Sequence, residues 1–251
     1  MLLGIAYFPP VSYFALIAEG MVFSGNQTIP STVFVEACEN YQKQSWRNRC
    51  RIYAADGPQY LNFPIVHEGG THELPITEIK VDYSTPWVIR TERAITSAYE
   101  SSAYFDYYKD ELFAILDSHP ETLFDLDLKI IRFFFRKIGL SVEIRFTDEY
   151  FPPERWPGGI CPARRWLPKR EGTHGVGSTA TGQMPSGHYG ADFREVLHPK
   201  RPDTVLKDLG LEKPYFQVFA RKYGFIPNLS IMDLLFNEGP DSILFLKTSS
   251  R

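Results

Sequence analysis

The hydrophobic pattern of the chain changes near residue 85, and this change constrains the fold more than any other feature. Upstream of it, short apolar or alternating runs follow one another with the period of two that is typical of β-strands. We expect strands over residues 2–8, 32–36, 48–54, 60–66, 76–82 and 141–147. Downstream of residue 85 the period becomes helical, and helices are expected between 86 and 138. The pattern predicts an α/β fold with a mixed sheet and with helices from the central segment, in one domain over residues 1–251.

The beginning of the chain predicts where a ligand would bind. The apolar run over 2–8 ends at two prolines, and residues 11–19 have the pattern of a helix. A strand that leads through a loop into a helix opens many α/β domains, whose ligands gather at the strand ends. Tyr7 and Tyr13, at either end of this loop, combine an aromatic ring with a hydroxyl group, as a sugar or nucleotide pocket would. Both are candidate substrate-binding residues.

Residues 36–51 concentrate charges, amides and aromatic rings in one short stretch. Glu36, Glu39 and Lys43 are candidate catalytic residues, with one of the glutamates as the proton acceptor. The competing interpretation is that Lys43 forms an ordinary surface ion pair of small energetic weight.

The second half of this stretch is a candidate anion site. In a strand that begins near residue 48, alternation places Arg49 and Arg51 on one face. Guanidinium groups bind phosphate or carboxylate through paired hydrogen bonds, so both arginines are candidate substrate ligands, with Asn48 and Tyr41 beside them. The alternative is a solvated edge strand whose charges protect it from aggregation.

A third polar segment lies near the C-terminal end. Asn228 and Asp233 are candidate substrate-binding residues, although Ser230 and Asp233 also have the spacing of a helix capping box. If residues 7–13, 41–51 and 228–237 build one pocket, these three segments converge in the fold.

The composition excludes several classes of protein. A formal charge of −3 gives no general attraction to nucleic acid, and 43% hydrophobic residues argue against global disorder. Three cysteines without a CxxC pair predict reduced thiols in a cytoplasmic protein. The N-terminus lacks the pattern of a secretion signal, and no apolar run approaches the roughly 20 residues of a membrane span, so neither is expected.

Residues 151–202 contain eight prolines and eight glycines and predict a long irregular loop or lid. The segment from His174 to Ser178 resembles a phosphate-binding loop only loosely, because no strand precedes it. The histidines of the loop and Cys161 have spacings that match no familiar zinc site. We therefore expect neither a metal nor a cofactor.

Several separated blocks together resemble the WbqC-like protein family. They are AYFPPVSYFALI at 6–17, ENYQKQSWRNR at 39–49, LNFPI at 61–65, the W…I…Y…YF helix at 87–105, and the segment over 215–237 that ends in GFIPNLSIMDLLFN. The resemblance spans essentially the whole chain apart from 151–202. Two departures are visible. Thr91 stands where relatives often carry a histidine, with Glu92 as a neighbouring substitute, and residues 25–32 lengthen the path between the first two blocks.

This resemblance implies a transferase-like enzyme of bacterial surface-polysaccharide (O-antigen type) biosynthesis. Glycyl or aminoacyl transfer onto a sugar is the reaction that it implies, with a sugar, a nucleotide-sugar or an aminoacyl donor as the small-molecule substrate. A non-catalytic sugar- or nucleotide-binding accessory protein is the alternative from another class, because no familiar nucleophile motif is present. A nucleotidylyltransferase-like site is a weaker third reading, since the HxGH histidines are missing.

Overall fold

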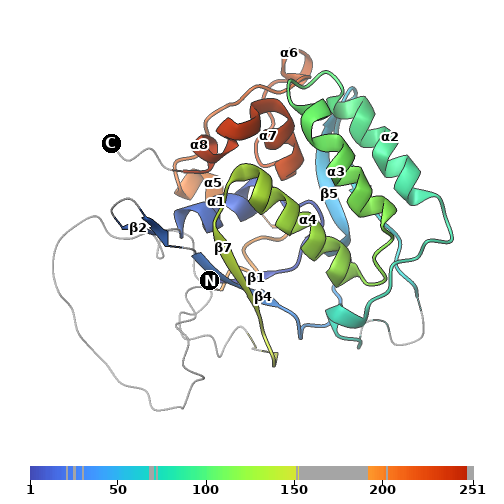
Figure 1. Ribbon diagram of the computed structural model, residues 1–251. Helices are drawn as coiled ribbons and strands as arrows, with labels where there is room; N and C mark the ends of the chain where they lie inside the picture. Colours follow the sequence, from blue (N-terminus) through green and yellow to red (C-terminus); the bar gives the residue numbers. More distant parts are fainter. Residues whose placement is uncertain are drawn as a thin grey trace.

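The computed structural model describes residues 1–20, 22–24, 27–29, 31–67, 71, 73–150, 152, 192–201 and 203–247 (Figure 1). Most of the segment expected to be a loop or lid, 151–202, lies outside the described residues. Among the helices that are described, none is long and apolar enough to cross a membrane.

A parallel sheet of three strands, in the order β1-β4-β7, lies at the centre of the fold (Figure 1). Its strands are β1 (Leu2–Gly4), β4 (Ser31–Glu36) and β7 (Val142–Phe146). Gly4 pairs with Glu36 and Val35 with Phe146, so the carboxyl ends of all three strands lie at one edge. Parallel strands require crossovers, which the helical segments supply. The expected α/β class is confirmed.

The antiparallel pairings occur in two separate hairpins. They are β2 (Val22–Ser24) with β3 (Gln27–Ile29), and β5 (Arg49–Ala54) with β6 (Gly57–Asn62). Gly57 begins β6 with a φ of 116°, which a residue with a side chain rarely adopts, and so allows the tight turn. The return strand of the second hairpin, β6, begins at residue 57, which is three residues earlier than the sequence pattern predicts.

Helices supply most of the remaining structure. They are α1 (Val11–Glu19), α2 (Trp87–Tyr99), α3 (Phe105–Asp117), α4 (Leu123–Ile138), α5 (Val205–Asp208), α6 (Ala220–Tyr223), α7 (Ile231–Glu238) and α8 (Ser242–Leu246). Short 3-10 turns are η1 (Trp46–Asn48), η2 (Ile76–Glu78) and η5 (Gly239–Asp241). In Figure 1, α2, α3 and α4 form a row, and α1, α7 and α8 gather beside α4.

Aromatic rings join α1 to α4 in the core. The ring of Phe14 lies 6.0 Å from that of Phe134 and 5.5 Å from that of Phe135, both at steep angles. Edge-to-face packing of this kind adds to the free energy of burial. Because α1 follows β1 directly, this contact fixes the loop between them, which carries Tyr7, against the long helix.

Two expected strands are shorter or absent. The prediction of a strand over 76–82 was wrong, because the segment forms η2 and then only isolated bridges, Lys80 to Thr122 and Val81 to Ile65. The strand expected over 2–8 ends at Gly4. After it the amide of Tyr7 donates to the carbonyl of Trp46 at 2.8 Å and Phe8 adopts a φ of 42°, which turns the chain out of the sheet.

We predict that Gly239→Ala destabilises the protein much more than Gly139→Ala. Both glycines have a positive φ, 54° and 79°, which is unfavourable for an alanine. A Cβ at Gly139 meets open space, whereas one at Gly239 lies 2.5 Å from the Tyr104 ring. Overpacking of this kind adds about 1–3 kcal/mol. Urea unfolding of the two variants measures the difference, and equal losses contradict the packing argument.

Candidate functional site

The carboxyl edge of the parallel sheet is where the polar segments meet. Gly4 ends β1, Glu36 ends β4 and Thr147 directly follows β7. A narrow cavity lies at this edge, lined by Gly4, Ile5, Ala6, Tyr13, Trp46, Arg47, Arg194 and Leu197. Its volume of about 10 Å³ has room for about one water molecule or a group of similar size. Crevices outside the carboxyl ends of parallel strands are the common ligand sites of α/β folds.

A buried ion network holds one side of this edge. Arg194 Nη1 donates to Glu36 Oε2 at 2.6 Å, and Arg194 Nη2 donates to Asp192 Oδ2 at 2.8 Å. The other oxygen of Glu36 accepts from the hydroxyl of Thr147 at 2.6 Å and from the amide of Cys38 at 2.9 Å. Burial raises the pKa of Glu36, against the opposing effect of these hydrogen bonds and of Arg194. The network therefore fastens residues 192–194 to the ends of β4 and β7.

A second buried pair joins Glu39 to Arg47. Arg47 Nε donates to Glu39 Oε1 at 2.8 Å, and Arg47 Nη2 donates to the other oxygen, so the contact is bidentate. A Cβ on Gly4 would lie 3.2 Å from Arg47 Nη2, so a side chain at the end of β1 would require the Arg47 guanidinium to shift by a few tenths of an ångström. The pair connects the loop after β4 to η1.

The candidate catalytic residues are thus placed very differently. Glu36 and Glu39 are 0% and 3% exposed, and each is paired with an arginine. Lys43 is exposed in the turn after β4 and forms no ion pair within the described ranges. The structure brings the two glutamates to the same edge but does not pair either of them with Lys43.

Arg49 lies at the surface side of this edge, beside aromatic rings. Its guanidinium carbon is 5.8 Å from the centre of the Tyr60 ring, which is itself 6.4 Å from the Trp46 ring. In the described part of the chain this guanidinium makes no hydrogen bond and no ion pair. Burial raises the pKa of Tyr41, and Arg49 opposes that rise, so Tyr41 also lies close to it. We call Trp46, Arg49 and Tyr60 the arginine–aromatic patch.

The third segment meets the other two through backbone groups. Val11 donates its amide to the carbonyl of Leu229 at 2.9 Å, and Ser230 donates its amide to the carbonyl of Arg51 at 2.8 Å. The side chain of Arg51 donates to the carbonyl of Pro227 at 2.9 Å. Residues 7–13, 41–51 and 228–237 therefore lie side by side.

The remaining candidates in these segments hold the fold together in the structure. Asn48 donates to the carbonyl of Phe63 at 3.2 Å. Asn228 accepts from the amide of Ser12 at 2.9 Å and donates to Asp203 at 2.6 Å.

Asp233 is part of a buried hydrogen-bond group rather than a helix cap. Its carboxylate accepts from the Tyr215 hydroxyl at 2.7 Å and from the Gln217 amide at 2.8 Å. Burial raises the pKa of Asp233 to about 6, and these two bonds limit the rise. Ser230 caps α7 alone by accepting from the amide of Met232 at 3.3 Å, so the capping interpretation of Asp233 was wrong.

Asp127, which the sequence analysis did not single out, is the most unusual group near the site. It lies on the buried face of α4 at 0% exposure, and neither of its oxygens has a hydrogen-bond partner among the described residues. Among the described residues, the hydroxyls of Tyr7 and Tyr13 also lack a hydrogen-bond partner of good geometry, although the side chain of Thr91 is close enough to lower the pKa of Tyr7. Burial raises the pKa of Asp127 well above its ordinary value, against the opposing charge of Arg47.

A signal for Asp127 does exist in the sequence. Its spacing from Leu123, Ile130 and Ile131 puts a carboxylate within the apolar stripe of an amphipathic helix. No comparable signal marks Asp192 or Arg194, because nothing in the surrounding proline- and glycine-rich sequence indicates which strand they contact.

The position that departs from the family pattern can also be located. Thr91 lies on the buried face of α2 and close to the hydroxyl of Tyr7. Glu92 lines a different cavity of about 420 Å³ between α2 and α3, with Arg93 and Phe113 among its neighbours.

Within the described ranges, no group of three or more histidine, cysteine or acidic side chains is arranged to hold a metal. His174, His188 and Cys161 fall outside those ranges.

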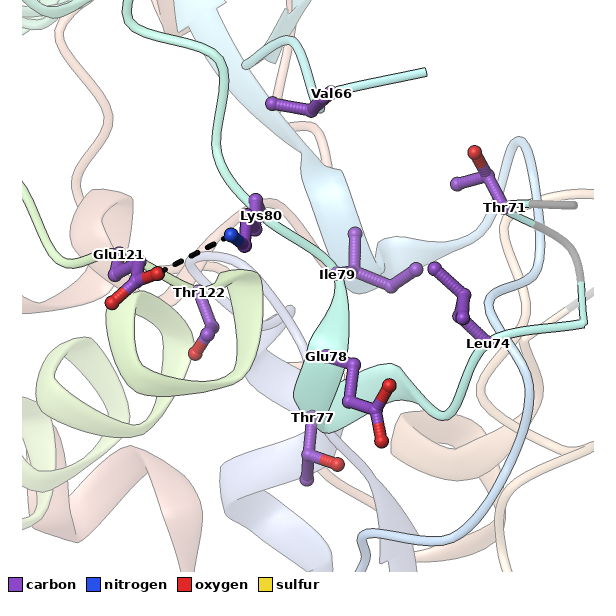
Figure 2. A pocket seen from close by; sticks show the side chains of 9 residues that line it. All are labelled: Val66, Thr71, Leu74, Thr77, Glu78, Ile79, Lys80, Glu121 and Thr122. Atoms are coloured by element: carbon purple, nitrogen blue, oxygen red, sulfur yellow. Dashed lines mark ion pairs between the residues drawn. The ribbon is translucent and has the colours of Figure 1, made fainter. Parts of the chain in front are cut away.

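A larger cavity of about 450 Å³ lies elsewhere, between η2 and the start of α4 (Figure 2). Its lining is Val66, Thr71, Leu74, Thr77, Glu78, Ile79, Lys80, Glu121 and Thr122. Lys80 and Glu121 form an exposed ion pair of 3.6 Å across one side. None of the candidate residues lines this cavity.

We predict that Arg194→Met is severely destabilising, because it leaves Glu36 and Asp192 buried without a counter-charge. Breaking a buried ion pair by removing one partner costs about 3–5 kcal/mol. The matched control is Arg145→Met, which breaks the exposed pair with Glu143 on β7 and costs about 0–1 kcal/mol. Urea unfolding of both variants measures the contrast. A loss of similar size in the two variants contradicts a structural role for the network.

We also predict that Asp127→Asn stabilises the protein increasingly as the pH rises. Burial keeps Asp127 protonated in the folded state at pH values where the unfolded chain has already released that proton. The folded state then binds more protons, so the contribution of Asp127 to the free energy of unfolding falls as pH rises above about 4.

The difference in free energy of unfolding between Asp127→Asn and the unmodified protein should widen by up to about 1.4 kcal/mol per pH unit. It stops widening once the pH reaches the pKa that Asp127 has in the folded state. Urea unfolding at several values from about pH 5 to about pH 8 measures it. Asp125→Asn, on the exposed face of the same helix, is the control and should show no such slope. A gap that does not change with pH rules out a buried protonated carboxyl.

Comparisons with known proteins identify the family of this chain. The chain is 26% identical over 245 residues to the uncharacterised protein Rv1507c of Mycobacterium tuberculosis (strain ATCC 25618 / H37Rv), which covers 96% of this chain and 94% of that protein. No solved structure matches. The WbqC-like protein family matches residues 6–161, which include strands β4 and β7 of the parallel sheet, the arginine–aromatic patch and α4. The chain belongs to the WbqC-like protein family.

Proposed function

We propose that the protein is a transferase-like enzyme of bacterial surface-polysaccharide biosynthesis, which binds an anionic sugar substrate such as a nucleotide-sugar at the arginine–aromatic patch. An aminoacyl group, glycyl by resemblance to the family, is the group transferred. Family membership supports the biological setting. The patch supports the chemistry of the substrate.

The observation that carries this proposal is the unpaired guanidinium of Arg49. A half-buried arginine without an acid or carbonyl partner among the described residues retains its capacity for a bidentate contact with phosphate or carboxylate. Tyr60, at 52% exposure, presents its ring beside that guanidinium. A flat, amphipathic ring next to a cation suits a ligand that has both a sugar or base and a phosphate.

Arg51, two residues along the same strand, shows the contrast. Its Nη2 donates to the carbonyl of Pro227, so this arginine is engaged in joining the hairpin to the segment before α7. Arg49 and Arg51 therefore form a matched pair in the same hairpin. One is available to a ligand and the other contributes to the fold.

Glu36 and Glu39 are the proposed proton acceptors. Burial raises the pKa of Glu36, which is the direction that a general base at neutral pH requires. Each carboxylate must first separate from its arginine, which a substrate phosphate or carboxylate would favour by competing for the guanidinium. Lys43, exposed on the adjoining turn, is proposed as an additional contact for substrate charge.

The pairing of both glutamates also favours a second candidate function. If the two ion pairs remain closed, the site has no available base, and the protein is then a non-catalytic accessory protein that binds a sugar or a nucleotide. Binding and turnover must therefore be measured separately.

The test begins with a panel of nucleotide-sugars in thermal-shift and calorimetric titrations. For a ligand that binds, Arg49→Ala should weaken binding by about 1.5–3 kcal/mol, the loss expected for a charge-assisted hydrogen bond, and leave the stability nearly unchanged. Arg51→Ala should instead lower the free energy of unfolding by about 0.5–1.5 kcal/mol through loss of the bond to Pro227.

The same ligands are then incubated with aminoacyl donors, and the products are separated by mass. Product formation that is lost in Glu36→Gln or Glu39→Gln supports a transferase. Tight binding without product supports the accessory protein. If Arg49→Ala destabilises the fold and binds normally, the patch is structural and the proposal fails.

A further inference from the structure

The outer edge of the parallel sheet is formed by β7. This strand has β4 on one side and, in the described part of the chain, no strand on the other (Figure 1). The opposite edge is covered, because Leu2 of β1 forms a bridge with Asp192 and accepts from the amide of Phe193 at 2.9 Å. An edge strand presents unpaired amides and carbonyls that can pair with another chain. The sheet can therefore be extended at β7.

The backbone groups that face outward belong to the even-numbered residues of β7. The amide of Thr147 donates to the carbonyl of Val35 on β4 at 3.2 Å. Successive residues of a strand direct their amide and carbonyl to opposite sides, so the odd-numbered residues bond to β4. Val142, Ile144 and Phe146 thus direct both of their backbone groups away from β4.

The two faces of β7 have different side chains. Val142 and Ile144 pack against the apolar core, and the ring of Phe146 lies 5.5 Å from an aromatic ring of α4. On the other face Glu143 and Arg145 are exposed and form an ion pair of 2.8 Å. The strand therefore has an apolar face, a charged face and an unpaired edge.

This strand is complementary to itself when two copies run antiparallel. If Ile144 of one copy lies opposite Ile144 of a second copy, Glu143 lies opposite Arg145 and Val142 lies opposite Phe146. The outward amides and carbonyls of each copy then bond to those of the other. The charged residues occupy the positions that are not hydrogen-bonded, where opposite side chains come closest.

Charge selects this register over its neighbours. A pairing centred on Glu143 places that carboxylate opposite its own copy, and a pairing centred on Arg145 does the same with the guanidinium. Like charges directly opposite one another destabilise a strand pair. A pairing centred on Ile144 is the register between these two, and it places every charge of the strand opposite the other sign.

The space beside the apolar face of this edge is open. A groove of about 360 Å³ lies between α4 and β7, lined by Arg132, Phe135, Arg136, Leu140, Val142 and Ile144. Charges on an edge strand commonly prevent pairing between copies, which they do by repulsion when they have one sign. Glu143 and Arg145 have opposite signs, so two antiparallel copies of β7 attract one another.

We propose that β7 is a dimerisation edge, to which a second copy of this chain adds its own β7, antiparallel and centred on Ile144. The two sheets then form one continuous sheet in the order β1-β4-β7-β7-β4-β1, with a two-fold axis through the Ile144 pair. Because the contact is short, the dimer depends on protein concentration. The proposal does not rest on the proposed function, since the narrow cavity at the carboxyl edge is not part of the interface.

Sedimentation velocity from low to high micromolar protein concentration tests this interface. The unmodified protein should shift from monomer to dimer as the concentration rises. Glu143→Arg and Arg145→Glu should each weaken the dimer by about tenfold, because the two-fold axis places each like-charged pair twice. The measurements are made at low ionic strength, since salt screens exposed charges.

The two weakened variants are matched partners for one another. An equimolar mixture of Glu143→Arg with Arg145→Glu places opposite charges at both positions and should restore the dimer. Urea unfolding should give each variant nearly the stability of the unmodified protein, because the ion pair that is lost is exposed. Asp106→Arg, which reverses an exposed acid on α3, is the control and should dimerise normally.

Three results would overturn the proposal. A monomer at every concentration would show that the charges protect the edge or that another protein covers it. A dimer that neither variant weakens would lie at a different surface. Dimerisation that both variants weaken and their mixture does not restore would show that Glu143 and Arg145 do not face one another across the interface.

Discussion

The buried ion pair between Glu36 and Arg194 is the interaction on which the carboxyl edge of the sheet depends. It joins the end of β4 to residues that follow it by more than 150 positions, and the Thr147 hydroxyl ties the same carboxylate to β7. A buried charge is stable only when its partner is held in good geometry. The pairing helps to hold the 192–201 segment over the end of the sheet, together with the backbone hydrogen bond from Phe193 to Leu2, and so helps to place Arg194 and Leu197 in the wall of the narrow cavity.

The second buried pair, Glu39 with Arg47, extends the same constraint to the hairpin. Because η1 leads directly into β5, fixing Arg47 also fixes Trp46 and Arg49 on either side of it. Arg47 is then satisfied internally and Arg49 is not. Two arginines only two residues apart therefore have different roles, and burial with a counter-charge is what distinguishes them.

Asp127 gives the site an internal asymmetry. The outer part of the edge has a cation beside exposed rings, whereas the inner part has an acid whose pKa is raised by burial and two hydroxyls surrounded by apolar packing. A buried acid without a partner lowers stability, and natural proteins retain such groups mainly at functional sites.

The sequence by itself determined the α/β class, the helices α1 to α4, most strands, and the grouping of polar segments near residues 7, 41 and 228, because hydrophobic period and turn residues act locally. It failed for 76–82, where the chain makes only single bridges after a 3-10 turn. Tertiary structure alone decided that Glu36 pairs with Arg194, that Arg51 is engaged while Arg49 is not, and that both oxygens of Asp127 are buried without a hydrogen-bond partner among the described residues. These depend on contacts between residues distant in the chain, and the free energy of a charge or hydroxyl is set by its surroundings after folding.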